Sequence, residues 1–214
     1  MDFADDPQAL LDRVKALRGA GRVLIGIAGC PGAGKSTAAA WLARTLDRAV
    51  QVPMDGFHLA NAELVRLGRR SRKGAIDTFD GAGYRALLRR IRTETDETVY
   101  APEFDRRVGE PVAGAIAVEP EAEIIVTEGN YLLDPEGPWP GVRDALTEVW
   151  YCETPEPLRL RRLVARHERF GKTPDHARSW VATVDEPNAE RIRAARDRAD
   201  LVVDFDALGI APGA

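Results

Sequence analysis

The residues with the clearest chemical potential form one glycine-rich segment. Gly29, Cys30, Pro31, Gly32, Ala33, Gly34, Lys35 and Ser36 fit the pattern Gly-x4-Gly-Lys-[Ser/Thr], and Thr37 follows. Glycines allow backbone N–H groups to converge on phosphates, and a helix that starts there adds the positive end of its dipole. Lys35 is expected to reach the β- and γ-phosphates, and the Ser36 hydroxyl to complete a magnesium shell. Residues 29–37 therefore predict a nucleotide-binding loop.

The segments on either side of this loop support the prediction. Residues 22–28 are an apolar, β-branched run without alternation, which is typical of a strand buried on both faces of a parallel sheet. A helix is expected directly after the loop, from Lys35 to about Leu46. The order strand, glycine-rich turn, helix is the context in which this motif binds phosphate.

Two carboxylates are expected at the same edge of that sheet. Glu128 follows the apolar run Ile124–Val126, and Asp55 follows a short strand predicted over Ala49–Met54. Ligands of open α/β sheets collect at the carboxyl ends of the strands. Glu128 is therefore a candidate magnesium-site acid, and Asp55 could accept the proton of an acceptor hydroxyl.

A charged helix is predicted from Thr154-Pro155 to about Phe170. It carries four arginines at i, i+3 and i+4 spacing, so that they share one face: Arg159, Arg162, Arg166 and Arg169. This helix is expected to act as a lid that lowers arginines onto the phosphates, which would stabilise the charge of a transferring phosphoryl group. The alternative is a face that only contacts solvent.

Composition excludes several classes of protein. The chain has 214 residues and a formal net charge of −4, which argues against a surface built to bind nucleic acid. No apolar run reaches the length of a membrane span, and the acidic N-terminus, residues 1–6, is unlike a secretory signal. We expect one cytoplasmic domain over residues 1–214, with the lid at about 155–185.

Lysine is rare in this chain: four of the 30 basic residues are lysines. Lys35 and Lys73 fall in segments with a predicted function. Lys15 and Lys172 are expected at the surface.

Further elements follow from periodicity and from turn residues. Helices are expected over about 7–17, 60–67, 82–92, 174–184 and 188–198, and strands over 98–101, 115–118, 123–127, 148–152 and 201–203. Strands that alternate with helices predict an α/β sandwich with a mostly parallel sheet.

The loop alone does not distinguish a kinase from a GTPase or a motor. None of the four lysines lies in an [Asn/Thr]-Lys-x-Asp guanine motif. A small-molecule kinase needs only a magnesium-binding carboxylate, a base near the acceptor and cations over the phosphates. Two alternatives stay open: a nucleotide-binding regulatory switch with slow hydrolysis, and a binding module without catalysis.

Taken together, these segments resemble the superfamily of uridine kinase, phosphoribulokinase and bacterial pantothenate kinase, and within it the branch that includes fructose-transport-system kinases. The resemblance rests on residues 29–37, 53–58 (PMDGFH), 73–80 (KGAIDTFD), 100–106 (YAPEFDR), 128–133 (EGNYLL) and Arg166-His167. It implies a P-loop NTPase fold, a three-layer α/β/α sandwich with a mostly parallel five-stranded sheet and a helical lid. It also implies ATP and Mg²⁺ as phosphoryl donor and metal.

Residue roles follow by position in this resemblance. Asp55 matches the catalytic carboxylate and Glu128 the second acidic residue of the magnesium site. Arg162 and Arg166 fall where lid arginines are expected. The segments that line the acceptor pocket contribute His58, Lys73, Phe104 and Arg106. The expected acceptor is a hydroxyl of a small metabolite, such as a sugar, a nucleoside or a pantothenate-like compound; a uridine/cytidine-type nucleoside kinase is the alternative. Dimers are common among such proteins, so a homodimer is also expected.

Overall fold

The computed structural model describes residues 6–19 and 21–210, so most of the acidic N-terminal segment lies outside the described residues. The helices are α1 (Pro7–Ala16), α2 (Lys35–Thr45), α3 (Asn61–Arg66), α4 (Gly81–Thr93), α5 (Trp139–Ala145), α6 (Glu156–Arg169), α7 (Pro174–Trp180) and α8 (Glu186–Ala194). The strands are β1 (Val23–Ala28), β2 (Ala49–Gln51), β3 (Val99–Asp105), β4 (Glu110–Val118), β5 (Ile124–Gly129), β6 (Glu148–Glu153) and β7 (Leu201–Asp204).

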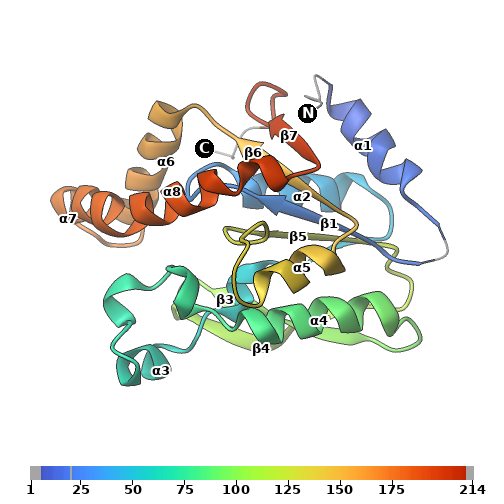
Figure 1. Cartoon of the computed structure of the whole chain (residues 1–214), viewed down its shortest axis with the longest axis horizontal. Coiled ribbons are helices and arrows are strands. Elements are labelled where there is room, and N and C mark those ends of the chain that lie inside the picture. The colour runs from blue at the N-terminus through green and yellow to red at the C-terminus, as the bar shows by residue number, and fades with distance from the viewer. Residues whose placement is uncertain (1–5, 20, 211–214) are drawn as a thin grey trace.

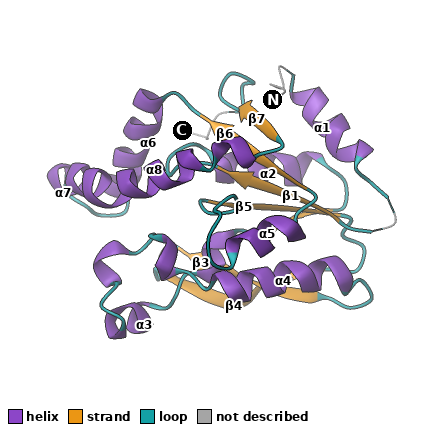
Figure 2. Cartoon of the chain, viewed as in Figure 1, coloured by secondary structure: helices purple, strands orange, loops and turns teal. Residues whose placement is uncertain are grey.

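Five strands form one parallel sheet in the order β2-β5-β1-β6-β7. Its two faces are covered by separate layers of helices (Figures 1 and 2), which confirms the predicted α/β/α sandwich. Alternate residues of β1 face opposite layers: Leu24 packs in the cluster with α4 and α5, whereas Ile25 packs in the cluster with α1 and α2. The side chains of Leu24 and Ile25 are both fully buried. This two-sided burial explains the apolar run without alternation.

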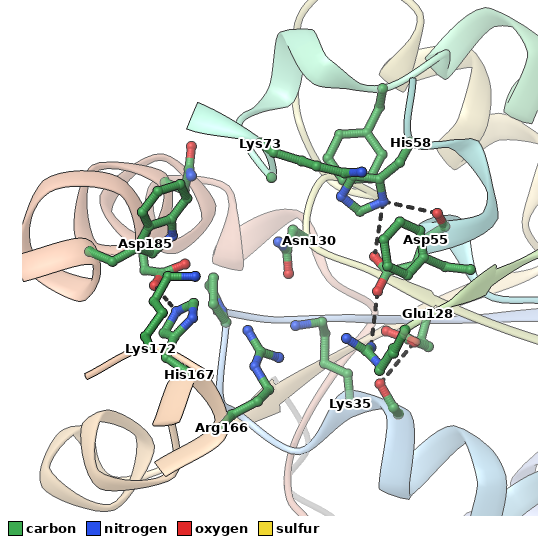
Figure 3. A pocket seen from close by; sticks show the side chains of 18 of the residues that line it. Lys35, Asp55, His58, Lys73, Glu128, Asn130, Arg166, His167, Lys172 and Asp185 are labelled. Carbon is green, nitrogen blue, oxygen red and sulfur yellow. Dashed lines mark hydrogen bonds and ion pairs between the residues drawn. The ribbon is translucent and has the colours of Figure 1, made fainter. Parts of the chain in front are cut away.

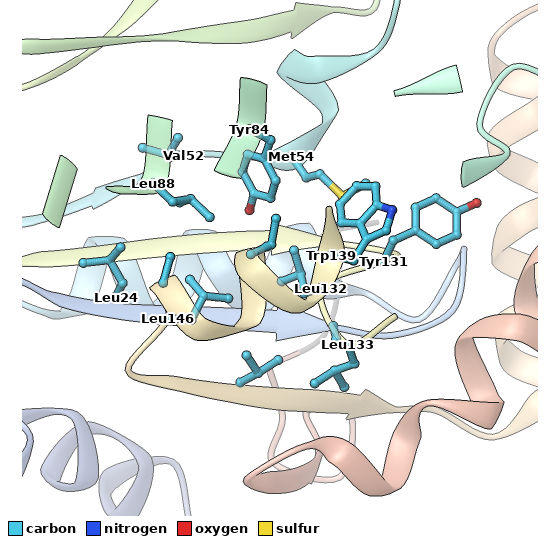
Figure 4. Close-up of a cluster of buried hydrophobic side chains, with 14 of the residues drawn as sticks. Leu24, Val52, Met54, Tyr84, Leu88, Tyr131, Leu132, Leu133, Trp139 and Leu146 are labelled. Atoms are coloured by element: carbon cyan, nitrogen blue, oxygen red, sulfur yellow. The ribbon is translucent and has the colours of Figure 1, made fainter. Parts of the chain in front are cut away.

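The cluster under α4 and α5 supports the strand ends that carry the site (Figure 4). Met54, Tyr84 and Trp139 pack there beside the carboxyl end of β5. The Tyr84 hydroxyl lies 2.6 Å from the Thr127 hydroxyl, so this buried polar pair is satisfied. The residue before Glu128 is thereby held in place.

The structure corrects three predicted strands and adds one helix that was not predicted. The strand predicted over 49–54 ends at Gln51, because Pro53 has no N–H to donate and the chain turns into a 3₁₀ turn, Met54–Phe57. The strands predicted near 98 and 115 are longer and form an antiparallel hairpin, β3–β4, outside the main sheet. The helix α5 was not predicted, since prolines at 138 and 140 and Gly141 obscure its pattern.

The last helical region also differs from the prediction. No break separates the helices that were expected over 174–184 and 188–198. A π-helical turn, Val181–Asp185, joins α7 to α8. Pro187, which cannot donate an N–H, lies just after this turn. Among the described residues, no helix is both long enough and apolar enough to cross a bilayer.

Candidate active site

The glycine-rich loop connects β1 to α2 and depends on the absence of side chains at two close approaches. Gly32 has φ +84°, and a Cβ there would lie 2.7 Å from the Arg159 carbonyl oxygen. A Cβ on Gly29 would lie 2.9 Å from the Cys152 carbonyl oxygen. Gly34, with φ +93°, is the N-cap of α2. Larger residues would force the loop away from α6 and β6.

Lys35 stands in the first turn of α2 and is 8% exposed. Its Nζ donates to the Cys30 carbonyl oxygen at 3.0 Å. Burial lowers the pKa of the Lys35 ammonium, while Glu128 nearby raises it. The Cys30 thiol is buried beside the Tyr151 hydroxyl, 3.4 Å away, so its side chain contributes to packing and its backbone to the loop.

The two carboxylates lie close together because β2, β5 and β1 are neighbours in the sheet. The Ser36 hydroxyl donates to Oε1 of Glu128 at 2.9 Å. Glu128 is 5% exposed, and its pKa is raised first by burial and then by the negative charge of Asp55. A cation bound near the carboxylate oxygens of Glu128 and Asp55 would offset the repulsion between their negative charges.

The donor set fits a magnesium ion. Ser36 and Glu128 offer a hydroxyl and a carboxylate oxygen, which are hard ligands. Within residues 6–19 and 21–210, no group of three or more His, Cys, Asp or Glu side chains could hold a metal by itself. Mg²⁺ commonly binds through one or two protein groups, with phosphate and water oxygens completing its shell.

Asp55 lies in the 3₁₀ turn after β2, opposite the loop. Its Oδ2 accepts from Nη2 of Arg106 at 3.3 Å, and its backbone oxygen lies 2.9 Å from Nδ1 of His58. Gly56 allows this turn to pack directly against the Pro102 carbonyl in β3. The hairpin thus brings Arg106 over Asp55, which sequence spacing of about 50 residues could not show.

Aromatic side chains form the wall next to Asp55. The His58 ring lies 4.0 Å from Phe79 and 4.9 Å from Phe104, measured between centroids. Burial lowers the pKa of His58, which favours the neutral imidazole. Lys73 Nζ lies 5.0 Å from the centre of the Phe104 ring and donates to Asn61 Oδ1 and to the Gly109 carbonyl.

Most of these side chains face one cleft of about 290 Å³. Its lining includes Lys35, Ser36, Asp55, His58, Lys73, Phe104, Arg106, Glu128 and Arg166. A second hollow of about 350 Å³ adjoins it and shares Ser36, Asp55 and Glu128. Figure 3 shows the loop side chains and the acceptor-side groups on facing walls. The structure thus brings most of the predicted site residues together.

Among the predicted catalytic residues, Arg162 is the exception. Its two terminal nitrogens donate to Asp206 at 2.7 and 2.6 Å, and it does not line the cleft. Arg166, one turn further along α6, does line it. Arg159 is 2% exposed and donates to the Pro31 carbonyl at 2.9 Å, which ties α6 to the loop. Three arginines of the same predicted face therefore have three different surroundings.

Several cleft residues were not predicted. Lys172, expected at the surface, lines the cleft with its Nζ 4.5 Å from the centre of the Trp180 ring. Arg70 and Asn130 also line it, as does the pair His167–Asp185, joined at 2.7 Å. Asn130 and His167 stand in segments that carry the family resemblance, and this was the signal available for them. The others lie in turns or on a helix face without a distinctive pattern.

Comparison with known proteins identifies the family. A "putative fructose transport system kinase" from Silicibacter sp. TM1040 has 38% identity to this chain and a TM-score of 0.84, with 91% of this chain and 97% of that one covered. The chain belongs to this family of P-loop small-molecule kinases. No family model matches it.

Two curated proteins are also similar to this chain. The "putative uridine kinase" of Schizosaccharomyces pombe is 44% identical over 136 residues, which cover 59% of this chain and 58% of that protein. The pantothenate kinase of Leifsonia xyli is 31% identical over 217 aligned residues, which cover 86% of this chain and 66% of that protein. The chain thus spans less than two thirds of the length of either curated relative.

Lys35→Ala is expected to weaken ATP binding by about 10- to 100-fold, because it removes a charge-assisted contact worth roughly 1.5–3 kcal/mol. Isothermal titration with ATP measures this change. Lys15→Ala is the matched control, since Lys15 is exposed on α1 and pairs with Asp12 at 3.1 Å. Equal ATP affinity in Lys35→Ala and the parent protein would contradict a phosphate-binding role.

Proposed function

We propose that this kinase transfers the γ-phosphoryl group of ATP to a hydroxyl of a small metabolite: a sugar, a nucleoside or a pantothenate-like compound. One observation carries the proposal. The loop lysine, the Ser36–Glu128 pair and Asp55 face a single cleft that has space for an acceptor. These are the parts that phosphoryl transfer requires, since catalysis there consists mainly of positioning and charge stabilisation.

The proposed roles follow from position. The loop amides of residues 29–37 and Lys35 hold the ATP phosphates. Ser36 and Glu128 would hold Mg²⁺, which when bound neutralises phosphate charge. Asp55 accepts the proton of the acceptor hydroxyl, or orients that hydroxyl, as the oxygen attacks phosphorus.

Arg166 is the proposed lid cation. No hydrogen bond or ion pair engages its guanidinium in the part of the chain that the structure describes, although it lines the cleft. Such a group is available for the charge that develops on the phosphoryl oxygens. The lid is proposed at about residues 155–185, within one domain, and His58, Lys73, Phe104 and Arg106 are proposed to line the acceptor site. A homodimer and a cytoplasmic location stay predictions.

The test is ADP release by the purified protein with ATP, Mg²⁺ and a panel of sugars, nucleosides and pantothenate. Acceptor-dependent release, with phosphorylated acceptor seen by mass spectrometry, is the expected result. ADP release that no acceptor alters would favour a regulatory switch instead. Tight ATP binding without any release would favour a binding module. A pyrimidine nucleoside belongs in the panel because one relative is named a "putative uridine kinase".

A further inference from the structure

The cleft has an excess of positive charge. Six cationic side chains line it, against three carboxylates: Lys35, Arg70, Lys73, Arg106, Arg166 and Lys172, against Asp55, Glu128 and Asp185. Only Arg106 forms an ion pair with one of these carboxylates, and Asp185 is bound by His167. ATP and its metal would engage the groups at the loop, namely Lys35 and Arg166. Arg70, Lys73 and Lys172 remain.

Arg70 and Lys73 lie on the acceptor side of the cleft, whereas Lys172 enters it from the proposed lid. Arg70 and Lys73 belong to the segment after α3, and Lys172 belongs to the turn between α6 and α7. Figure 3 shows Lys73 and Lys172 entering the cleft from different elements, on two sides of the space near Asn130. No ion pair neutralises any of the three among residues 6–19 and 21–210.

Lys73 is held in place with part of its bonding capacity unused. Its ammonium has three N–H donors, and two of them go to neutral oxygens, Asn61 Oδ1 at 2.8 Å and the Gly109 carbonyl at 2.7 Å. Partial burial and the nearby Arg70 lower the pKa of Lys73, while the more distant Glu110 carboxylate raises it. Lys172 packs on Trp180 by a ring contact only. Both are positioned to receive an anion.

We propose that the acceptor carries an anionic group, a carboxylate or a phosphate monoester, which binds between Lys73 and Lys172 with Arg70 at the rim while its hydroxyl faces Asp55. This inference rests on the proposed kinase function. A neutral sugar or nucleoside would leave these cations without a counter-charge, whereas an anionic acceptor would form charge-assisted hydrogen bonds with them. The acceptor is therefore a small hydroxy acid or a phosphorylated polyol rather than a neutral sugar or nucleoside.

Matched pairs of acceptors test the charge. Glycerol is compared with glycerate and glycerol 3-phosphate, fructose with fructose 1-phosphate, and panthenol with pantothenate. The anionic members of a pair are expected to be phosphorylated with a kcat/KM at least about 10-fold above the neutral member. Preference within the anionic set then distinguishes a carboxylate from a phosphate. Equal or faster turnover of the neutral members would overturn the inference while leaving the kinase function intact.

A binding measurement separates the inference from catalysis. Fluorescence of Trp180, which lies under Lys172, is titrated with the same pairs while a non-hydrolysable ATP analogue occupies the loop, with Trp180→Phe defining the background. Lys73→Met and Lys172→Met are expected to weaken anion binding by about 10-fold or more and to leave affinity for the analogue unchanged. Lys15→Met is the control. Selective anion binding without phosphoryl transfer would overturn the proposed function alone. Unaltered anion binding in both lysine variants would overturn the inference.

Discussion

Asp55→Asn is expected to lower kcat by roughly 10²- to 10⁴-fold, the range that a positioned general base contributes. The amide has the shape of the carboxylate and can still accept from Arg106, but it cannot take a proton. ATP affinity should change little, because Asp55 faces the loop across the cleft and contacts no residue of it by hydrogen bond or ion pair among the described residues. Steady-state kinetics with titration of ATP measure both quantities.

The control for this variant is Asp12→Asn, which removes an exposed carboxylate on α1 far from the cleft lining. It should leave kcat unchanged. If Asp55→Asn lost tight ATP binding together with activity, Asp55 would instead be a nucleotide-binding or folding residue. If it kept full activity, acceptor activation by Asp55 would be wrong.

Arg166→Gln is expected to lower kcat by about 10³-fold, since an arginine that neutralises the transferring phosphoryl group contributes at least this much in related chemistry. The loss should be larger in kcat than in the KM for ATP, because the charge develops in the transition state. Within the described residues, no carboxylate forms an ion pair with the Arg166 guanidinium. Its removal therefore leaves no carboxylate without its partner. Rate measurements across ATP concentrations check the prediction.

Arg162→Gln provides a matched control on the same helix. Its guanidinium is bound to both oxygens of Asp206, so kcat should stay within a few-fold of the parent value. The substitution is expected instead to lower the free energy of unfolding by about 1 kcal/mol or less, because the Arg162–Asp206 pair is partly exposed. Denaturant unfolding measures this change. A large fall in kcat for Arg162→Gln, with none for Arg166→Gln, would reverse the assignment made from the structure.

The arginines of α6 show where sequence reasoning reached its limit. Helical spacing placed Arg159, Arg162 and Arg166 on one face, and the structure agrees that they share α6. Spacing could not separate them, because each one meets a different distant partner: the loop carbonyl of Pro31, Asp206 after β7, and the cleft. Lys172 was misjudged for the same reason, since its place in the cleft depends on the turn after α6 and on Trp180 of α7.

The geometry of the glycine-rich loop, by contrast, was predictable because it is local. Glycines within a few residues set the backbone, and the next residues start the helix. Glu128 was predictable as a candidate, since a buried apolar run indicates where a parallel strand ends, whereas Asp55 lies in the 3₁₀ turn after the shorter, half-buried strand β2. Their mutual proximity also depends on strand order, which placed β2 beside β5 and β5 beside β1.

What the sequence by itself determined is therefore the loop, the sheet type and the chemical identity of the acids and cations. The tertiary structure alone decided which arginine of α6 faces the cleft, that the hairpin β3–β4 carries Arg106 to Asp55, and that Lys73 and Lys172 share one cleft. The physical reason is the separation along the sequence of the residues that interact. Backbone conformation and helix or strand periodicity are set by neighbours in the chain. Charge pairing and cleft lining are set by contacts between residues far apart in the sequence, and only packing brings those together.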